Sequence, residues 1–157
     1  MQRIAADVSR PQGGDAQDGA ARPPRPLPEL DLWNRAFWTG GAEGRLMIAR
    51  CASCGYWLHP PGPVCPECLS REVGAQEVSG RGTVNTFTVN HQPWHPAFAT
   101  PYVIALVELD EQPQLRLVTN LVDCDPAQLR IGMPVEVCFE QVEDVFIPLF
   151  RPVGEPA

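Results

Sequence analysis

The chain has 157 residues, enough for one ordinary domain or for a small module joined to one β domain. Its formal charge is -7, and every positive side chain is an arginine, since the sequence contains no lysine. An acidic chain is repelled by phosphate backbones and by anionic membranes, so the composition argues against a partner held by charge alone.

Residues 1–28 are predicted to be a disordered tail or linker. They mix small, polar and charged residues without a period, and they end in a proline-rich run that favours extended polyproline geometry. We expect this segment to be dispensable for folding. The chain shows no apolar core of a signal peptide and no stretch as long as a transmembrane helix. The sequence therefore predicts a cytoplasmic protein whose cysteines stay reduced.

A helix is predicted within residues 29–44. Asp31 can cap its first turn, and the Gly40-Gly41 pair is expected to end it. Apolar side chains recur along it at helical spacing, namely Leu30, Trp33 and Phe37, with Trp38 beside them. This aromatic stripe is either a face packed on the rest of the protein or a docking face for a partner.

Residues 45–78 are predicted to form a zinc ribbon, with a strand at 45–50 leading into its first ligand pair. The ligands are two CxxC pairs separated by ten residues: Cys51 and Cys54, then Cys65 and Cys68. Four thiolates in a tetrahedron make a closed structural zinc site, because no coordination position is left for a substrate. Gly55 follows the first pair, where the chain must turn without a Cβ. We expect one zinc ion with a structural role.

Other uses of the cysteines are alternatives. A lone CxxC can be a redox dithiol, but two pairs at this distance favour a metal. The same four ligands could hold iron in a rubredoxin-like site. His59 lies between the pairs and could replace one ligand, although four cysteines already fill the coordination shell. Cys124 and Cys138 are expected to be small thiols that are buried or half-buried.

Residues 79–152 are predicted to form a β domain, because the hydrophobic period changes to two. Five strands are expected, at 83–89, 102–109, 115–122, 135–139 and 145–150. A helical turn at 125–129, ahead of the fourth strand, fits a five-stranded OB-fold barrel better than a sandwich. The predicted fold class is mainly β, with an N-terminal helix, a rubredoxin-like zinc ribbon and an OB-fold domain in that order.

The connection between the first two barrel strands is unusually aromatic. It carries His91, Trp94, His95, Phe98 and Tyr102 among three prolines. A loop this apolar either covers one end of the barrel or orders against a partner. An imidazole there could act as a general base, because it titrates near neutral pH. Neither histidine has a nearby carboxylate in the sequence to orient it.

The order of these motifs resembles a known family, the zinc-ribbon/OB-fold accessory proteins long catalogued as a domain of unknown function. The resemblance covers about residues 28–152, and the motifs that carry it lie at 37–38, 50–55, 64–68, 80–89, 91–98, 101–110 and 130–140. The cysteine pairs alone indicate only a zinc ribbon, so the ordered set makes the resemblance specific. Gln112 stands where relatives commonly place glycine, so the turn at 110–114 is expected to differ in shape.

The resemblance implies an accessory subunit with no catalytic residues, bound to a thiolase-superfamily enzyme in a heterotetramer or larger assembly. Such subunits are similar to partners of benzylmalonyl-CoA-type thiolases, of archaeal thiolase/HMG-CoA synthase complexes and of retro-aldolases that shorten steroid side chains. The segment 91–98 most resembles the retro-aldolase group, in which a MaoC-type enoyl-CoA hydratase can precede the domain. A CoA thioester is expected at the interface with the partner, where the 91–102 segment would order near the acyl-CoA entrance of that enzyme.

Two further functions are alternatives. Zinc ribbons and OB folds both serve as nucleic-acid-binding modules. Residues 83–150, however, carry two arginines, Arg116 and Arg130, against nine Asp and Glu, which cannot form a basic groove. A stand-alone acyl-CoA enzyme would need a nucleophile–base pair, an open metal site or a glycine-rich phosphate cradle, and the sequence shows none of them.

Overall fold

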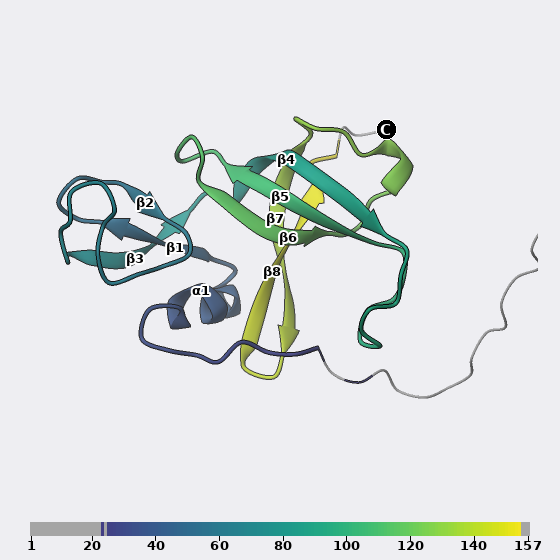
Figure 1. The fold of residues 1–157 in the computed structure, drawn as a ribbon, viewed down its shortest axis with the longest axis horizontal. Coiled ribbons are helices and arrows are strands. Elements are labelled where there is room, and N and C mark those ends of the chain that lie inside the picture. The colour runs from purple at the N-terminus through teal and green to yellow at the C-terminus, as the bar shows by residue number, and fades with distance from the viewer. Residues whose placement is uncertain (1–22, 24, 155–157) are drawn as a thin grey trace, which may run out of the picture.

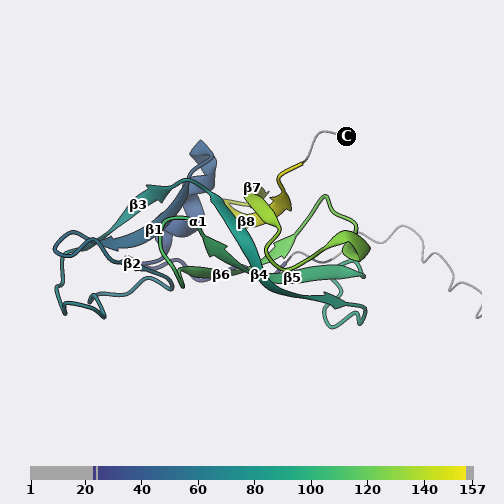
Figure 2. The same ribbon diagram turned by 90° about the horizontal axis from the view of Figure 1, so that it is seen from above.

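The computed structural model describes residues 23 and 25–154 (Figure 1). A three-stranded sheet and a closed five-stranded barrel lie at opposite ends of the molecule, and a short helix packs between them (Figures 1 and 2). The predicted mainly β class, with a zinc-ribbon region followed by an OB-type barrel, is confirmed.

The helical segment begins later than the hydrophobic spacing suggests. Helix α1 covers Arg35–Thr39, and a 3-10 turn, η1, follows at Gly40–Glu43. Asp31 does act as a cap, because its Oδ1 accepts from the backbone N–H groups of Trp33 and Asn34, each at 2.7 Å. The cap closes a turn ahead of α1 instead of the first turn of the helix itself.

The segment also ends differently. Gly40 keeps a right-handed φ of -60°, and the chain leaves the helical region at Gly44, whose φ is +71°. Gly40 thus caps the end of α1, as predicted, but the chain continues through the 3-10 turn η1 as far as Gly44. A Cβ on Gly41 would lie 2.5 Å from Phe139 Cδ1 and from Phe146 Cβ, so this glycine lets η1 approach the barrel closely.

Only part of the aromatic stripe is packed. Phe37 is buried in the barrel core, and its ring meets that of Trp38 edge-to-face at 4.7 Å. Trp33 is 42% exposed and Leu32 is fully on the surface. Because α1 is a little over one turn long, the side chains before it do not share its buried face. No helix in the described part of the chain is long and apolar enough to cross a membrane.

The ribbon sheet has the order β2-β1-β3, with antiparallel pairing throughout. Its strands are β1 (Leu46–Cys51), β2 (Trp57–Leu58) and β3 (Val73–Val78). Only β1 has a clear signal in the sequence, since β2 is two residues long and the middle of β3 is exposed. Leu46, Ile48 and Val78 belong to the same buried cluster as the barrel interior. The base of the ribbon therefore shares the barrel core.

The barrel closes in the order β4-β5-β6-β8-β7, with β7 paired back to β4. Its elements are β4 (Arg81–Asn90), β5 (Tyr102–Leu109), β6 (Arg116–Leu121), η2 (Pro126–Gln128), β7 (Pro134–Val142) and β8 (Val145–Pro152). One pairing is parallel, between β6 and β8 at Leu121 and Phe150. Alternate residues of β5 point inward and are buried, as the period of two predicts.

Candidate metal centre and aromatic loop

The four predicted ligands meet at one point of the ribbon. The sulfur atoms of Cys51, Cys54, Cys65 and Cys68 all lie within 4.8 Å of one another. Cys51 Sγ is 3.6 Å from Cys68 Sγ, and Cys54 Sγ is 3.6 Å from Cys65 Sγ. A tetrahedral zinc with Zn–S bonds of about 2.3 Å holds its sulfurs about 3.8 Å apart, which is close to the two shorter distances in the cluster.

Both ligand loops have the same backbone design. In the first loop the N–H of Cys51 donates to Tyr56 O and the N–H of Gly55 donates to Cys51 O, both at 2.9 Å. In the second loop the equivalent bonds run from the N–H of Cys65 to Ser70 O at 2.9 Å and from the N–H of Leu69 to Cys65 O at 3.0 Å. The residue after each pair must be left-handed to close the loop. Gly55 has φ +80° and Leu69 has φ +60°, so the first loop avoids a strain that the second accepts.

Electrostatics shows why the cluster needs a cation. The backbone N–H of Cys54 donates to the sulfur of Cys51 and is the main reason that the pKa of Cys51 falls to about 6. The N–H of Tyr56 acts in the same direction on Cys54, but burial and the three neighbouring thiols outweigh it and raise that pKa to about 12. A divalent ion at the cluster would favour the thiolate form of both of these cysteines.

Polar groups around the sulfurs tie the two ligand loops together. Ser53 Oγ lies 2.8 Å from Ser70 Oγ and donates to Glu72 Oε2 at 2.8 Å. The backbone N–H of Ala52 donates to Glu72 O at 2.8 Å. Such outer contacts fix the positions of the ligands. His59 is not part of the cluster, because its ring packs on Phe37 at 5.0 Å, so the alternative of a histidine ligand is excluded.

The five residues predicted for the aromatic loop do not lie at one place in the structure. His95, Phe98 and Tyr102 form a row of contacting rings. The first pair meets edge-to-face with centroids 5.8 Å apart, and the second pair is tilted with centroids 5.4 Å apart. Trp94 lies outside this row and is 78% exposed, with its Nε1 donating to Asn90 Oδ1 at 3.0 Å. His91 is exposed at the start of the loop. Phe98 is thus half-buried against the barrel end, whereas Trp94 faces solvent.

An uncharged surface extends from this loop across the outside of β4, β5 and β6. Leu106 lies opposite Val118, which is 70% exposed, and Ile104 is next to Leu106 on the same face. Two charged residues border this surface, Glu108 near the end of β5 and Arg116 at the start of β6, and they lie opposite each other and pair at 2.9 Å. The surface therefore offers apolar contact area with no unbalanced charge.

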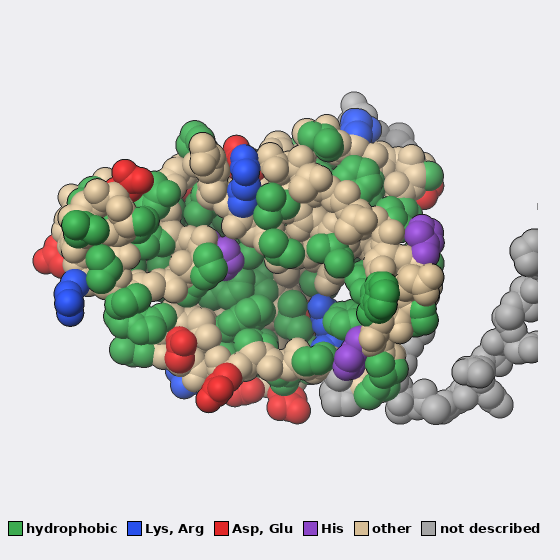
Figure 3. Space-filling view, in the orientation of Figure 1, with side chains coloured by type: hydrophobic (Ala, Val, Ile, Leu, Met, Phe, Trp, Pro, Cys, Tyr) green, Lys and Arg blue, Asp and Glu red, His purple; other side chains and the backbone are tan. Residues whose placement is uncertain are grey.

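Val118 also borders an apolar hollow of about 480 Å³ beside α1, at the centre of the face in Figure 3. We call it the central groove. Its lining includes Phe37, Trp38, His59, Leu117 and Val118.

Two contacting residues were not identified from the sequence. Arg25 lies in the segment expected to be disordered, yet its guanidinium contacts the barrel and the aromatic loop. Gln112 was noted only as a departure from glycine, but its side chain bonds the backbone of Trp57 across the two lobes. The sequence predicts neither the contacts of Arg25 nor those of Gln112, because each contact joins residues that are far apart in the chain. The expected disorder of residues 1–22 lies outside the described part of the chain.

Comparison with known proteins gives the family. Residues 38–74 match the model of the ChsH2 rubredoxin-like zinc ribbon domain, and residues 75–140 match that of the ChsH2 C-terminal OB-fold domain. A DUF35 domain-containing scaffold protein of Methanocaldococcus jannaschii is 37% identical over 101 residues, which are 63% of this chain and 70% of that protein. The chain belongs to the DUF35 family. Its four-cysteine cluster lies within the matched zinc ribbon domain and could hold a metal ion.

Two other relatives are longer proteins named as hydratase subunits. A probable enoyl-CoA hydratase alpha subunit of Thermomonospora curvata is 43% identical over 91% of this chain and 44% of its own length. The 3-oxo-4,17-pregnadiene-20-carboxyl-CoA hydratase alpha subunit of Mycobacterium tuberculosis is 39% identical over 74% of this chain and 36% of its own length. The chain thus spans less than half of these two relatives.

A solved structure carries the same DUF35 fold. A chain of the Ltp2-ChsH2(DUF35) aldolase superposes with a TM-score of 0.72 at 45% identity, covering 82% of this chain and 100% of that one.

Proposed function

We propose that this chain is a non-catalytic accessory subunit of a thiolase-superfamily enzyme, a thiolase or retro-aldolase, that acts on acyl-CoA thioesters in steroid side-chain degradation. The likeness to the Ltp2-ChsH2(DUF35) aldolase, over the whole of the matched chain, is the observation that carries this proposal. The mycobacterial relative, a hydratase subunit named for a pregnadiene carboxyl-CoA, supports a steroid CoA ester as the substrate.

The residues of the chain support an accessory role. A cluster of four thiolates leaves a bound zinc no open position, so the ion can hold the ribbon together but cannot activate a substrate. Within the described residues neither His91 nor His95 pairs with a carboxylate, and His95 Nδ1 accepts from the N–H of Ala97 at 3.1 Å. A general base is normally oriented by such a partner. The proposal therefore assigns the chemistry to the bound enzyme.

The proposed interface is the aromatic loop together with the uncharged outer face of β4–β6. Exposed aromatic and aliphatic side chains there, above all Trp94 and Val118, have the character of interface anchors. A CoA thioester would lie where the loop meets the partner, near His91, His95, Phe98 and Tyr102. A heterotetramer or larger assembly, and the presence of a MaoC-type hydratase in it, are part of the same proposal, supported by the two hydratase-subunit relatives.

Binding to a thiolase-superfamily enzyme of the same organism tests the proposal. We expect the two proteins to co-purify, and Trp94→Ala to weaken their association by about 2 kcal/mol, roughly thirtyfold in Kd. Leu32→Ala is the matched control, since Leu32 is an exposed apolar residue in the turn ahead of α1, outside the proposed interface. Equal effects of the two substitutions, or no co-purification, would contradict the proposed interface.

Activity measurements separate an accessory subunit from an enzyme. The isolated chain should turn over no acyl-CoA thioester, and the complex should. His91→Ala and His95→Ala variants that keep the complex but lose activity would place that imidazole at the reacting groups. Turnover by the isolated chain, or tight binding of single-stranded nucleic acid at physiological salt, would overturn the proposal.

A further inference from the structure

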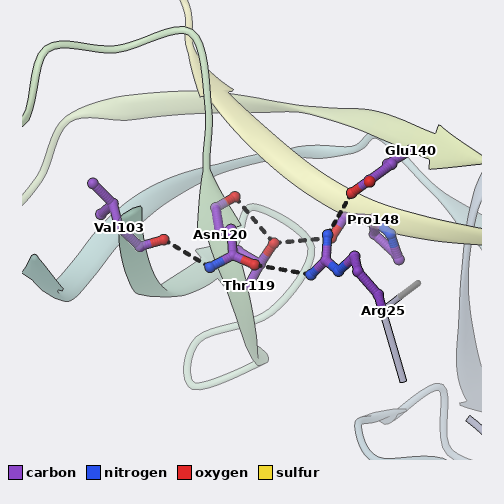
Figure 4. Close-up of polar contacts among 6 residues, drawn as sticks. All are labelled: Arg25, Val103, Thr119, Asn120, Glu140 and Pro148. Carbon is purple, nitrogen blue, oxygen red and sulfur yellow. Dashed lines mark hydrogen bonds and ion pairs between the residues drawn. The ribbon is translucent and has the colours of Figure 1, made fainter. Parts of the chain in front are cut away.

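One arginine ahead of the helix joins three parts of the barrel domain (Figure 4). The Arg25 guanidinium donates to Glu140 on β7 and, through its other terminal nitrogen, to Asn120 Oδ1 on β6 at 3.2 Å. Its central carbon lies 4.9 Å from the ring centroid of Phe98 in the aromatic loop. Only 19% of the Arg25 side chain is exposed. The guanidinium is therefore enclosed between two strands and the loop.

The barrel presents a fixed receptor for this guanidinium. Asn120 Nδ2 donates to Val103 O at 2.9 Å, which leaves the amide oxygen to face Arg25 (Figure 4). Next to it, Thr119 Oγ1 donates to Pro148 O on β8 at 2.9 Å. Both side chains are thus held by backbone carbonyls of neighbouring strands. A planar guanidinium suits this arrangement, because it can donate in two directions while its face stacks on an aromatic ring.

The aromatic loop itself has few ties to the barrel. The hydrogen bonds of its described residues are local, such as Phe98 N–H to His95 O at 3.1 Å and Ala97 N–H to His95 Nδ1 at 3.1 Å. Beyond these, Phe98 packs on Tyr102 and on the Arg25 guanidinium. The ring of Phe98 is therefore the point at which the loop can be held, and Arg25 reaches it from outside the barrel.

Residues 25–28, which we call the strap, pass the tip of the β7–β8 hairpin in Figure 1. Arg25, at the start of the strap, is the residue that reaches the loop. A cleft of about 300 Å³ lies between the strap and the loop, lined by Arg25, Pro26 and Pro28 on one side and His95 and Phe98 on the other. Prolines restrict the unfolded strap, so less entropy is lost when it is ordered.

We propose that Arg25 is a positioning residue: through the strap it holds Phe98, and with it His95, against the end of the barrel. The segment before the folded domain therefore sets the position of the aromatic loop. This inference concerns the isolated chain and stands apart from the proposed function. Only its consequence, that a displaced strap weakens partner binding, rests on that function.

Amide hydrogen exchange of the full chain tests the role of Arg25. In Arg25→Ala we expect the amides of Ala97 and Phe98 to exchange about fivefold faster or more, with the ribbon amides unchanged. Arg35→Ala is the matched control, because it removes the same charge from an exposed position on α1, where alanine favours the helix. Arg25→Lys should give an intermediate rate, since lysine keeps the charge but cannot donate in two directions and stack at once.

A double-mutant cycle assigns the effect to the contact with the barrel. Arg25→Ala should change loop exchange much less in a Glu140→Ala background than in the native chain. Unchanged loop exchange in Arg25→Ala, an equal effect of Arg35→Ala, or full additivity with Glu140→Ala would each overturn the inference. If these tests fail while Trp94→Ala still weakens association with the enzyme, the proposed function stands and only the positioning role falls.

Discussion

His59 could be a metal ligand by its place in the sequence, but the structure makes it a packing residue. It lies between the two cysteine pairs, but its imidazole turns away from the sulfurs and packs on Phe37 at 5.0 Å, beside the central groove. Burial disfavours the charged imidazolium, so the pKa of His59 is lowered from its ordinary value of 6.5. His59 is therefore a neutral packing residue of the folded protein.

This burial makes stability depend on pH. Between the lowered pKa and 6.5 the unfolded chain binds more protons at His59 than the folded chain does, so the free energy of unfolding falls as the pH falls through this range. We expect His59→Gln to show a shallower fall than the native protein in urea unfolding between about pH 7.5 and pH 5. His91→Gln, at an exposed histidine, is the control substitution. Identical slopes in native protein and His59→Gln would contradict this account.

At the scale of elements, the turn between β5 and β6 joins the barrel to the ribbon. Gln112 Oε1 accepts from Trp57 N–H at 2.9 Å, and its Nε2 donates to Trp57 O at 3.2 Å. In the same turn Glu111 Oε1 accepts from the N–H of Ser79, between the two lobes, at 2.6 Å. Arg50 covers the ring of Trp57 at 4.8 Å. The side-chain amide of Gln112 thus pairs with the backbone at the edge of β2 as a neighbouring strand would.

Removing this amide should loosen the ribbon on the barrel. We expect Gln112→Ala to lower the free energy of unfolding by about 1–2 kcal/mol, because the half-buried N–H and C=O of Trp57 lose their partner. The Trp57 amide should exchange faster, while amides within β5 and β6 stay protected. Gln92→Ala, at an exposed glutamine, is the control and should match the native protein. A native-like exchange rate of the Trp57 amide in Gln112→Ala would show that the Gln112 side chain does not hold the ribbon on the barrel.

At the scale of the whole molecule, one strand connects the metal site to the barrel core. β1 begins with Leu46 and Ile48 in the shared hydrophobic cluster and ends with Cys51, a buried ligand. The ribbon contributes only a small second cluster of its own, around Leu58 and Cys65. A lobe this small cannot bury enough apolar surface to be stable without a cross-link. A metal ion held by the four cysteines would supply that cross-link.

Loss of the metal should therefore destabilise the barrel as well as the ribbon. We expect one zinc per native chain by elemental analysis, and none in Cys51→Ser. Structural zinc contributes on the order of 10 kcal/mol in small sites, so Cys51→Ser should be strongly destabilised, with amide protection lost first in β1–β3. Cys124→Ser is the control, because Cys124 lies outside the cluster. A fully stable Cys51→Ser protein without metal would exclude the structural role, and iron in place of zinc would show as a coloured protein.

The sequence by itself determined the features that depend on neighbouring residues. The spacing of two CxxC pairs fixes a tetrahedral thiolate site, because each pair needs only its own loop to present two sulfurs. The period of two along 102–109 determines which side chains of β5 face the core, because a strand alternates its faces. The excess of acidic residues in the barrel likewise follows from the sequence alone.

The tertiary structure alone decided the contacts between distant residues. β3 is mostly exposed and has no hydrophobic period, so only its pairing with β1 makes it a strand. The Gly40-Gly41 pair resembles a helix end locally, but the approach of η1 to Phe139 and Phe146 explains Gly41. Arg25 reaches Glu140, and Gln112 reaches Trp57, across long stretches of chain. Local propensity carries no information on such pairs, because their free energy exists only once the barrel has closed and brought both partners together.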